Sequence, residues 1–211
     1  MTDTSAFVPV AIPPLGLAGE LRLADPARGV VIFAHGSGSS RLSPRNRRVA
    51  EALTGAGLAT LLFDLLTEVE AGDRRNVFDI DLLARRLVDA IDWVVSQPAL
   101  AALPIGLFGA STGAAAALKA AAARPRAVMA VVSRGGRPDL AGEALSQVRA
   151  PTLLIVGGND EPVLGWNREA AEQIGGPVRV TVIPGATHLF EEPGAMDQVT
   201  SLAADWFAKR M

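Results

Sequence analysis

A serine flanked by glycines is the clearest candidate for chemistry in this sequence. Residues 109–113 read Gly-Ala-Ser-Thr-Gly, after an apolar run at 104–108 and before an alanine-rich run at 112–123. A strand that turns directly into a helix would hold the Ser111 hydroxyl clear of the sheet edge, as a nucleophilic serine requires. The alternative is that Ser111 only caps the helix, because serine is a favoured residue at helix N-termini.

A nucleophilic serine needs a base to take its proton, and the base needs an acid to orient it. The chain has two histidines. His35 closes a predicted strand and is interpreted as structural, which leaves His188, in a loop before the last predicted helix, as the base. Asp160 follows the preceding predicted strand and is the expected acid, although it could instead shape a turn or cap a helix. Asp139, after another strand, is the alternative acid.

The attacked carbonyl oxygen becomes negative and needs backbone N–H donors, each worth about 3 kcal/mol in the transition state. One donor is expected at Thr112, the residue after the serine. The other is expected in the loop at 35–40, which reads His-Gly-Ser-Gly-Ser-Ser. The amide of Ser37 is the first choice there, and that of Gly38 is the second.

Two arginines lie near these loops in the sequence. Arg41 follows the 35–40 loop, and Arg134 ends a predicted strand. A guanidinium can hold a carboxylate through two parallel hydrogen bonds, so either residue is a tentative binding group for a substrate carboxylate. The alternative for Arg41 is a solvated first turn of a helix.

The counts of a few residue types exclude whole classes of mechanism. The chain has 211 residues, no cysteine, no tyrosine and only two histidines. A thiolate nucleophile, a disulfide and a phenolic acid are therefore impossible, and a zinc site has few ligands to draw on. The net charge of −2 gives no sign of the strongly basic character that is typical of nucleic-acid-binding proteins. We expect no cofactor, no metal and no nucleic-acid partner.

The sequence also gives no sign of a membrane segment. The first seven residues lack the basic and apolar regions of a signal peptide, and no stretch of about 18 uncharged apolar residues occurs. A cytoplasmic protein with no membrane partner is the expectation.

Short apolar runs alternate with helical patterns along the chain, which predicts a single α/β domain over residues 1–211. The last six runs are almost wholly apolar, as in strands covered on both faces. The expected sheet has about eight strands, mostly parallel, with helices on both faces and no separate lid domain. The predicted strands are 8–12, 19–23, 30–34, 58–63, 105–108, 128–132, 152–156 and 178–183, and the predicted helices are 44–56, 80–95, 112–123, 164–174 and one from about 193.

This set of residues resembles the α/β-hydrolase superfamily, and most closely its dienelactone-hydrolase-like branch. The resemblance rests on the His-Gly pair at 35–36, the 109–113 motif, the Gly-x-x-Asp-x-x-Val run at 157–163, and His188. It implies an α/β-hydrolase fold and hydrolysis of an ester or lactone through an acyl-enzyme. Dienelactone hydrolases use a cysteine nucleophile, whereas this chain has Ser111, which points toward a general serine esterase.

The leading hypothesis is therefore a serine hydrolase for small esters, lactones or thioesters, with a small-molecule substrate as its partner. Acyl transfer would use the same acyl-enzyme. One alternative is a hydrolase-like protein that only binds a ligand. Another is an anion- or nucleotide-binding module built on the glycine-rich loop at 36–40, although the G-x-G-x-x-G pattern fails because residue 41 is arginine. The oligomeric state is left open.

Overall fold

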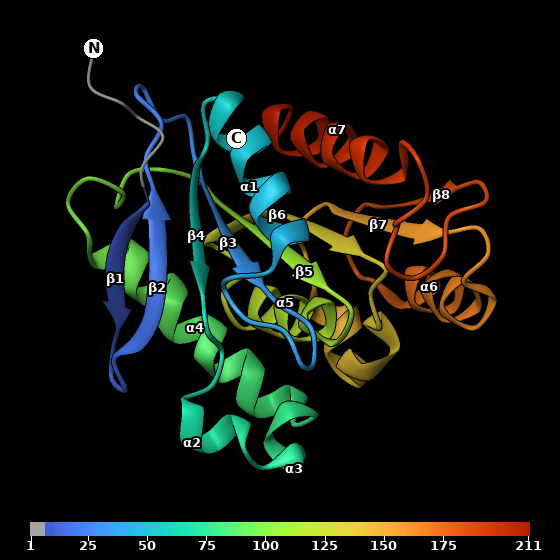
Figure 1. Cartoon of the computed structure of the whole chain (residues 1–211), viewed down its shortest axis with the longest axis horizontal. Coiled ribbons are helices and arrows are strands. Elements are labelled where there is room, and N and C mark those ends of the chain that lie inside the picture. Colours follow the sequence, from blue (N-terminus) through green and yellow to red (C-terminus); the bar gives the residue numbers. More distant parts are fainter. Residues whose placement is uncertain (1–6) are drawn as a thin grey trace.

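The computed structural model describes residues 7–211, which form one eight-stranded sheet with helices on both faces (Figure 1). Residues 1–6, and with them most of the segment considered above for a signal peptide, lie outside the described residues. The strands are β1 (Val8–Ile12), β2 (Leu17–Arg22), β3 (Val30–Ala34), β4 (Ala59–Phe63), β5 (Ile105–Ala110), β6 (Val128–Arg134), β7 (Thr152–Gly157) and β8 (Val178–Ile183).

The strand order across the sheet is β1-β2-β4-β3-β5-β6-β7-β8. The β1–β2 and β2–β4 pairs are antiparallel, and every other pair is parallel. The expected mostly parallel sheet is therefore confirmed. Because β3 to β8 run in one direction, the loops that follow them meet at one edge of the sheet, where open α/β sheets bind ligands.

The central strands β3, β4, β5 and β7 are buried at every residue, which agrees with their continuous apolar sequences. The same expectation for β8 is wrong. This strand lies at the sheet edge, and Arg179 and Val182 are exposed. An apolar run alone does not distinguish a central strand from an edge strand, because strand order depends on the path of the whole chain.

Two layers of helices enclose the sheet. The helices are α1 (Pro44–Gly55), α2 (Glu68–Ala71), α3 (Arg74–Val77), α4 (Ile80–Ser96), α5 (Thr112–Ala123), the 3₁₀ segment η1 (Pro138–Gln147), α6 (Glu161–Gln173) and α7 (Ala195–Ala208). Helices α1 and α7 pack on one face, and α4, α5, η1 and α6 line the other (Figure 1). Each layer encloses its own apolar core. No helix within residues 7–211 is long and apolar enough to cross a membrane.

Three short helical segments, α2, α3 and η1, were not predicted. Helices α2 and α3 have four residues each and bury none of them, so they show no helical repeat of apolar residues. Helix α2 is held instead by a capping box between Thr67 and Glu70. The η1 segment is broken by Gly142, whose φ is 56°. Together α2 and α3 connect β4 to α4 near the edge of the sheet where the candidate residues lie.

Candidate active site

Ser111 occupies a sharp turn between β5 and α5. Its φ of 51° and ψ of −124° are rare for a residue with a side chain, and conformations of this kind cost about 1–3 kcal/mol. The flanking glycines allow the turn: a Cβ on Gly109 would lie 2.4 Å from Ala114 Cα, and one on Gly113 would lie 2.3 Å from Ala34 O. The Ser111 side chain makes no capping hydrogen bond to α5. Ser111 therefore occupies the N-cap position of α5, but the structure gives no support to a side-chain capping role.

Three loops bring Ser111, His188 and Asp160 together. The distance from Ser111 Oγ to His188 Nε2 is 3.3 Å, and the distance from His188 Nδ1 to Asp160 Oδ2 is 2.7 Å. The Asp160 side chain is 13% exposed, so the carboxylate is largely shielded from water. With Nδ1–H donating to Asp160, Nε2 is left to accept the Ser111 hydroxyl proton. The alternative acid, Asp139, is bound by Arg137 instead.

The loops that carry Asp160 and His188 are fastened to each other. Asn159 N–H donates to Ala186 O at 2.9 Å, and the Asn159 side-chain amide donates to Gly185 O at 3.0 Å. At Gly157 the loops approach so closely that a Cβ would lie 2.3 Å from Ala186 O. These backbone contacts fix the separation of the carboxylate and the imidazole.

The two expected oxyanion donors lie side by side, but one already has a partner. Ser37 N–H donates to the Thr112 hydroxyl oxygen at 3.0 Å, which joins the 35–40 loop to the first residue of α5. A substrate oxygen would have to replace or share this acceptor. The sequence predicted a role for the backbone amides of Ser37 and Thr112. It did not predict that the Thr112 hydroxyl would accept a hydrogen bond from the Ser37 amide.

His35 connects the same loop to the end of β4. Its Nε2 accepts a hydrogen bond from Leu65 N–H at 3.1 Å, so Nδ1 carries the proton and donates to Gly36 O at 3.0 Å. Acceptance at Nε2 requires a neutral imidazole, and burial lowers the pKa of His35. The structural role expected for His35 agrees with these contacts.

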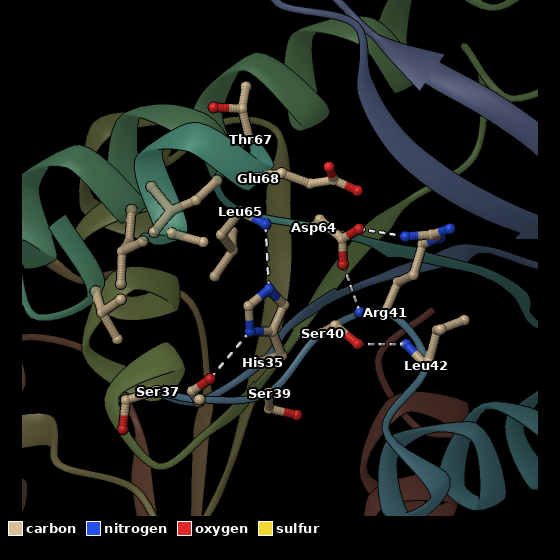
Figure 2. Close-up of a pocket in the computed structure, with 16 residues that line it drawn as sticks. His35, Ser37, Ser39, Ser40, Arg41, Leu42, Asp64, Leu65, Thr67 and Glu68 are labelled. Carbon is tan, nitrogen blue, oxygen red and sulfur yellow. Dashed lines mark hydrogen bonds and ion pairs between the residues drawn. The ribbon is translucent and has the colours of Figure 1, made fainter. Parts of the chain in front are cut away.

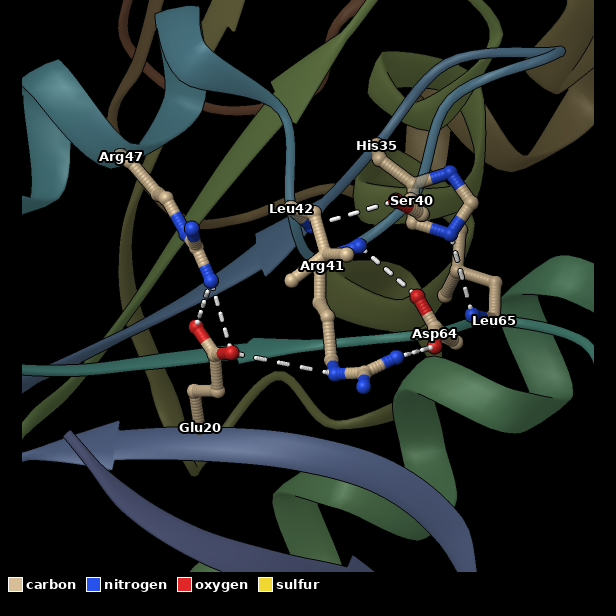
Figure 3. A network of polar contacts seen from close by, with 8 residues as sticks. All are labelled: Glu20, His35, Ser40, Arg41, Leu42, Arg47, Asp64 and Leu65. Atoms are coloured by element: carbon tan, nitrogen blue, oxygen red, sulfur yellow. Dashed lines mark hydrogen bonds and ion pairs between the residues drawn. The ribbon is translucent and has the colours of Figure 1, made fainter.

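The Arg41 side chain already interacts with carboxylates of the protein itself (Figure 3). Its guanidinium pairs with Asp64, and its backbone N–H donates to the same carboxylate at 2.7 Å. Its Nε lies 4.0 Å from Glu20, which also accepts two hydrogen bonds of 2.7 Å from Arg47. A substrate carboxylate at Arg41 would have to displace these partners, so the structure gives no support to that expectation.

Arg134 is the other arginine singled out in the sequence, and it is buried. The residue is 7% exposed, and its guanidinium carbon lies 6.0 Å from the centre of the Phe190 ring. No carboxylate within residues 7–211 forms an ion pair with it. Burial lowers the pKa of Arg134 to about 10, which still leaves it charged at neutral pH. Its backbone carbonyl accepts a hydrogen bond from Ser111 N–H at 3.2 Å.

A cavity of about 340 Å³ opens beside Ser111, between the 35–42 loop and residues 64–83 (Figure 2). Gly36 lines this cavity and also lies close to the serine, since a Cβ on Gly36 would lie 3.7 Å from Ser111 Oγ. Sequence reasoning missed the wall contributed by residues 64–83, because its apolar side chains have the same signature as core residues. The lining residues are His35, Gly36, Ser37, Gly38, Ser39, Ser40, Arg41, Leu42, Asp64, Leu65, Leu66, Thr67, Glu68, Ala71, Val77 and Leu83.

Solved structures with the same fold include close and distant relatives. A dienelactone hydrolase from Anabaena variabilis is 56% identical, with a TM-score of 0.94 over 97% of both chains. Est1E from Butyrivibrio proteoclasticus is 15% identical, with a TM-score of 0.81 over 97% of this chain and 98% of its own, and it supports the fold alone.

A curated relative in Mycobacterium tuberculosis, which carries the provisional name phosphoribosyl transferase, is 62% identical over 200 residues. The match covers 95% of this chain and 45% of the relative, so the chain spans less than half of that protein's length. Residues 27–209 match the alpha/beta hydrolase domain family. This match and the 56% identity with the Anabaena enzyme confirm the resemblance seen in the sequence. The chain belongs to the alpha/beta hydrolase family and is a dienelactone-hydrolase-like member of it.

Proposed function

We propose that this protein is a serine hydrolase that cleaves small carboxylic esters, lactones or thioesters through an acyl-enzyme on Ser111. The observation that carries the proposal is the continuous chain of contacts from Asp160 through His188 to Ser111, with distances of 2.7 and 3.3 Å. These groups and distances suit a nucleophile, a general base and an orienting acid. The 56% identity with a dienelactone hydrolase supports the hydrolase class.

In the first half of the reaction, Ser111 Oγ attacks the carbonyl carbon while His188 Nε2 takes the hydroxyl proton. Asp160 stabilises the imidazolium that results. The tetrahedral intermediate then collapses: the bond to the alcohol oxygen breaks, and the proton on His188 Nε2 passes to that oxygen. The acyl group stays on Ser111. In the second half, His188 takes a proton from water, and the hydroxide oxygen attacks the acyl carbon. The bond from that carbon to Ser111 Oγ then breaks, the carboxylic acid leaves, and His188 returns the proton to Ser111 Oγ.

The negative oxygen of the intermediate would lie against the amide N–H groups of Thr112 and Ser37. The Thr112 amide belongs to the first residue of α5, where the helix dipole also favours negative charge. The Ser37 amide donates to the Thr112 hydroxyl in the free protein. In the acylation step it would turn to the substrate oxygen, or share its proton between the two acceptors.

We do not propose a phosphoribosyl transferase activity for this chain, although the mycobacterial relative carries that name. More than half of that relative has no counterpart here, since the match covers 45% of it. This chain itself matches the alpha/beta hydrolase domain family over residues 27–209, and its catalytic candidates are Ser111, His188 and Asp160.

A fluorophosphonate probe tests the proposal, because it reacts with an activated serine and leaves a covalent adduct. We expect one adduct on Ser111 in the unmodified protein, located by mass spectrometry, and no adduct in Ser111→Ala or His188→Ala. The exposed α7 serine gives a matched control: Ser201→Ala should label like the unmodified protein. A folded, unmodified protein that acquires no adduct on Ser111 would contradict the proposal and favour a protein that only binds its ligand.

A further inference from the structure

We propose that the 340 Å³ cavity beside Ser111 holds the acyl group of the substrate and selects acyl groups without charge. This inference rests on the proposed function and adds the substrate class to it. Three features of the molecule support it: the strand order, the close approach of Gly36 to Ser111, and the apolar and charged groups in the cavity wall.

The strand order decides which part of an ester enters the cavity. Ser111 follows β5. The loops after β7 and β8, which carry Asp160 and His188, lie on one side of it, and β3 and β4 lie on the other. The leaving alcohol must lie against His188 Nε2, because it receives its proton there. The acyl group therefore extends away from His188, over the ends of β3 and β4, where the cavity is.

The loop that forms one wall of the cavity lies beside the serine. Gly36, Ser37 and Gly38 line the cavity, and the Gly36 backbone lies directly against Ser111. A Cβ on Gly36 would lie only 3.0 Å from Ser111 Cβ, so the glycine lets the loop that lines the cavity lie directly against the serine. Under this proposal, the acyl group on Ser111 Oγ passes this loop and enters the cavity.

The far wall suits an apolar group of moderate size. Leu65 and Leu83 are buried, and Leu66 and Val77 are partly buried, all lining the same space. The volume is roughly twice the 150 Å³ that suffices for a benzene molecule in an apolar protein cavity. An aliphatic chain of several carbons or a substituted aromatic ring would fit and would lose its apolar contact with water.

The charged groups of the wall disfavour an anionic acyl group (Figures 2 and 3). Arg41 is paired with Asp64 and lies near Glu20, so carboxylates of the protein already compensate its charge. Glu68, which is exposed, also lines the cavity and has no ion-pair partner within the described residues, so the lining residues include two carboxylates and one guanidinium. His35 is neutral, because its Nε2 accepts a hydrogen bond. A substrate carboxylate placed there would lose water and gain no counter-ion, which is costly.

The experiment compares esters of the same alcohol that differ only in the acyl group: phenyl acetate, phenyl hexanoate and the half-ester monophenyl adipate. Hexanoate and adipate have six carbons each, so their comparison isolates the charge. We expect kcat/KM for the hexanoate to exceed that for the adipate at least about tenfold, and Glu68→Gln to reduce this ratio several-fold. Equal kcat/KM values for the two esters would overturn the charge selection.

A pair of valines tests the location of the acyl group. Val77 lines the cavity, and Val77→Trp should lower the hexanoate-to-acetate ratio of kcat/KM about tenfold or more, because the indole occupies the space for the chain. Val69 is 89% exposed and does not line the cavity, so Val69→Trp should leave both rates unchanged. A Val77→Trp variant with an unaltered ratio would overturn the acyl assignment.

Two further results keep this inference separate from the proposed function. A protein that hydrolyses no ester and takes up no fluorophosphonate label fails as a serine hydrolase, whatever its cavity does. A protein that is labelled and hydrolyses the adipate half-ester as well as the hexanoate keeps the proposed function and overturns the selection for neutral groups. If Arg134→Met then abolished only the adipate activity, the substrate carboxylate would be assigned to that buried guanidinium.

Discussion

At the scale of single residues, Asp160 and Asp139 show how burial and pairing separate two similar carboxylates. Both follow strands at the same edge of the sheet. Asp160 lies 2.7 Å from His188, whereas both oxygens of Asp139 accept hydrogen bonds from Arg137. The sequence allowed either residue as the acid, because it does not show which side chain is already bound.

Asp160→Asn therefore makes the sharpest prediction at this scale. The amide keeps the shape but cannot stabilise an imidazolium, and its NH₂ group favours the wrong tautomer of His188. We expect kcat for phenyl acetate to fall by roughly 10³–10⁴-fold with the fold intact. Asp139→Asn is the matched change and should keep kcat within about twofold. Equal losses in the two variants would show that Asp160 has no special role.

At the scale of elements, the close packing of α5 against β3 holds the serine turn in place. Gly113 lies in the first turn of α5, where a Cβ would meet Ala34 O at 2.3 Å and His35 O at 2.5 Å. Helix α5 is therefore pressed onto the backbone that leads into the 35–40 loop. Both proposed oxyanion donors depend on this approach.

Two glycine substitutions test that packing. Replacing glycine by alanine inside a helix usually stabilises a protein by about 0.5–1 kcal/mol. At Gly165 in α6, a methyl group would meet no neighbouring atom within 4 Å, so Gly165→Ala should raise the free energy of unfolding by about that amount. Gly113→Ala should lower it, because two backbone carbonyls cannot give way cheaply. Urea unfolding measures both; stabilisation by Gly113→Ala would contradict the close packing.

At the scale of the whole molecule, composition and burial together determine the response to pH. The chain has two histidines and no cysteine, so few side chains titrate between pH 5 and 8. Burial lowers the pKa of His35 in the folded protein, whereas in the unfolded chain it returns to about 6.5. Below that value the unfolded chain binds a proton that folded His35 does not bind. Lowering the pH therefore favours unfolding.

We expect the free energy of unfolding to decrease as the pH falls from about 7.5 to 5, with His35 contributing at most about 1.4 kcal/mol per pH unit. His35→Gln removes this titration and can still accept from Leu65 N–H, so its stability should depend less on pH over the same range. Urea unfolding at several pH values measures the slopes. A variant with a slope as steep as that of the unmodified protein would show that His35 does not titrate on unfolding.

The sequence by itself determined the fold class, most element positions and the three residues that meet at the site. Apolar runs and glycine-flanked turns are local signals, and a parallel sheet brings the loops after its strands to one edge, so Ser111, Asp160 and His188 could be chosen together. Helices α2 and α3 were not predicted from the sequence. Each has only four residues and none of them is buried, so neither shows a periodic pattern of apolar residues.

Only the tertiary structure decided what each side chain touches. It paired Arg41 with Asp64 and brought it near Glu20, gave the Ser37 amide a partner in Thr112, and buried Arg134 beside Phe190. It also placed apolar residues of the 64–83 segment in the wall of a cavity. Such contacts join residues far apart in the chain, and they depend on strand order and on how closely helices pack. Local sequence patterns carry information about periodicity and turns, but not about these distances.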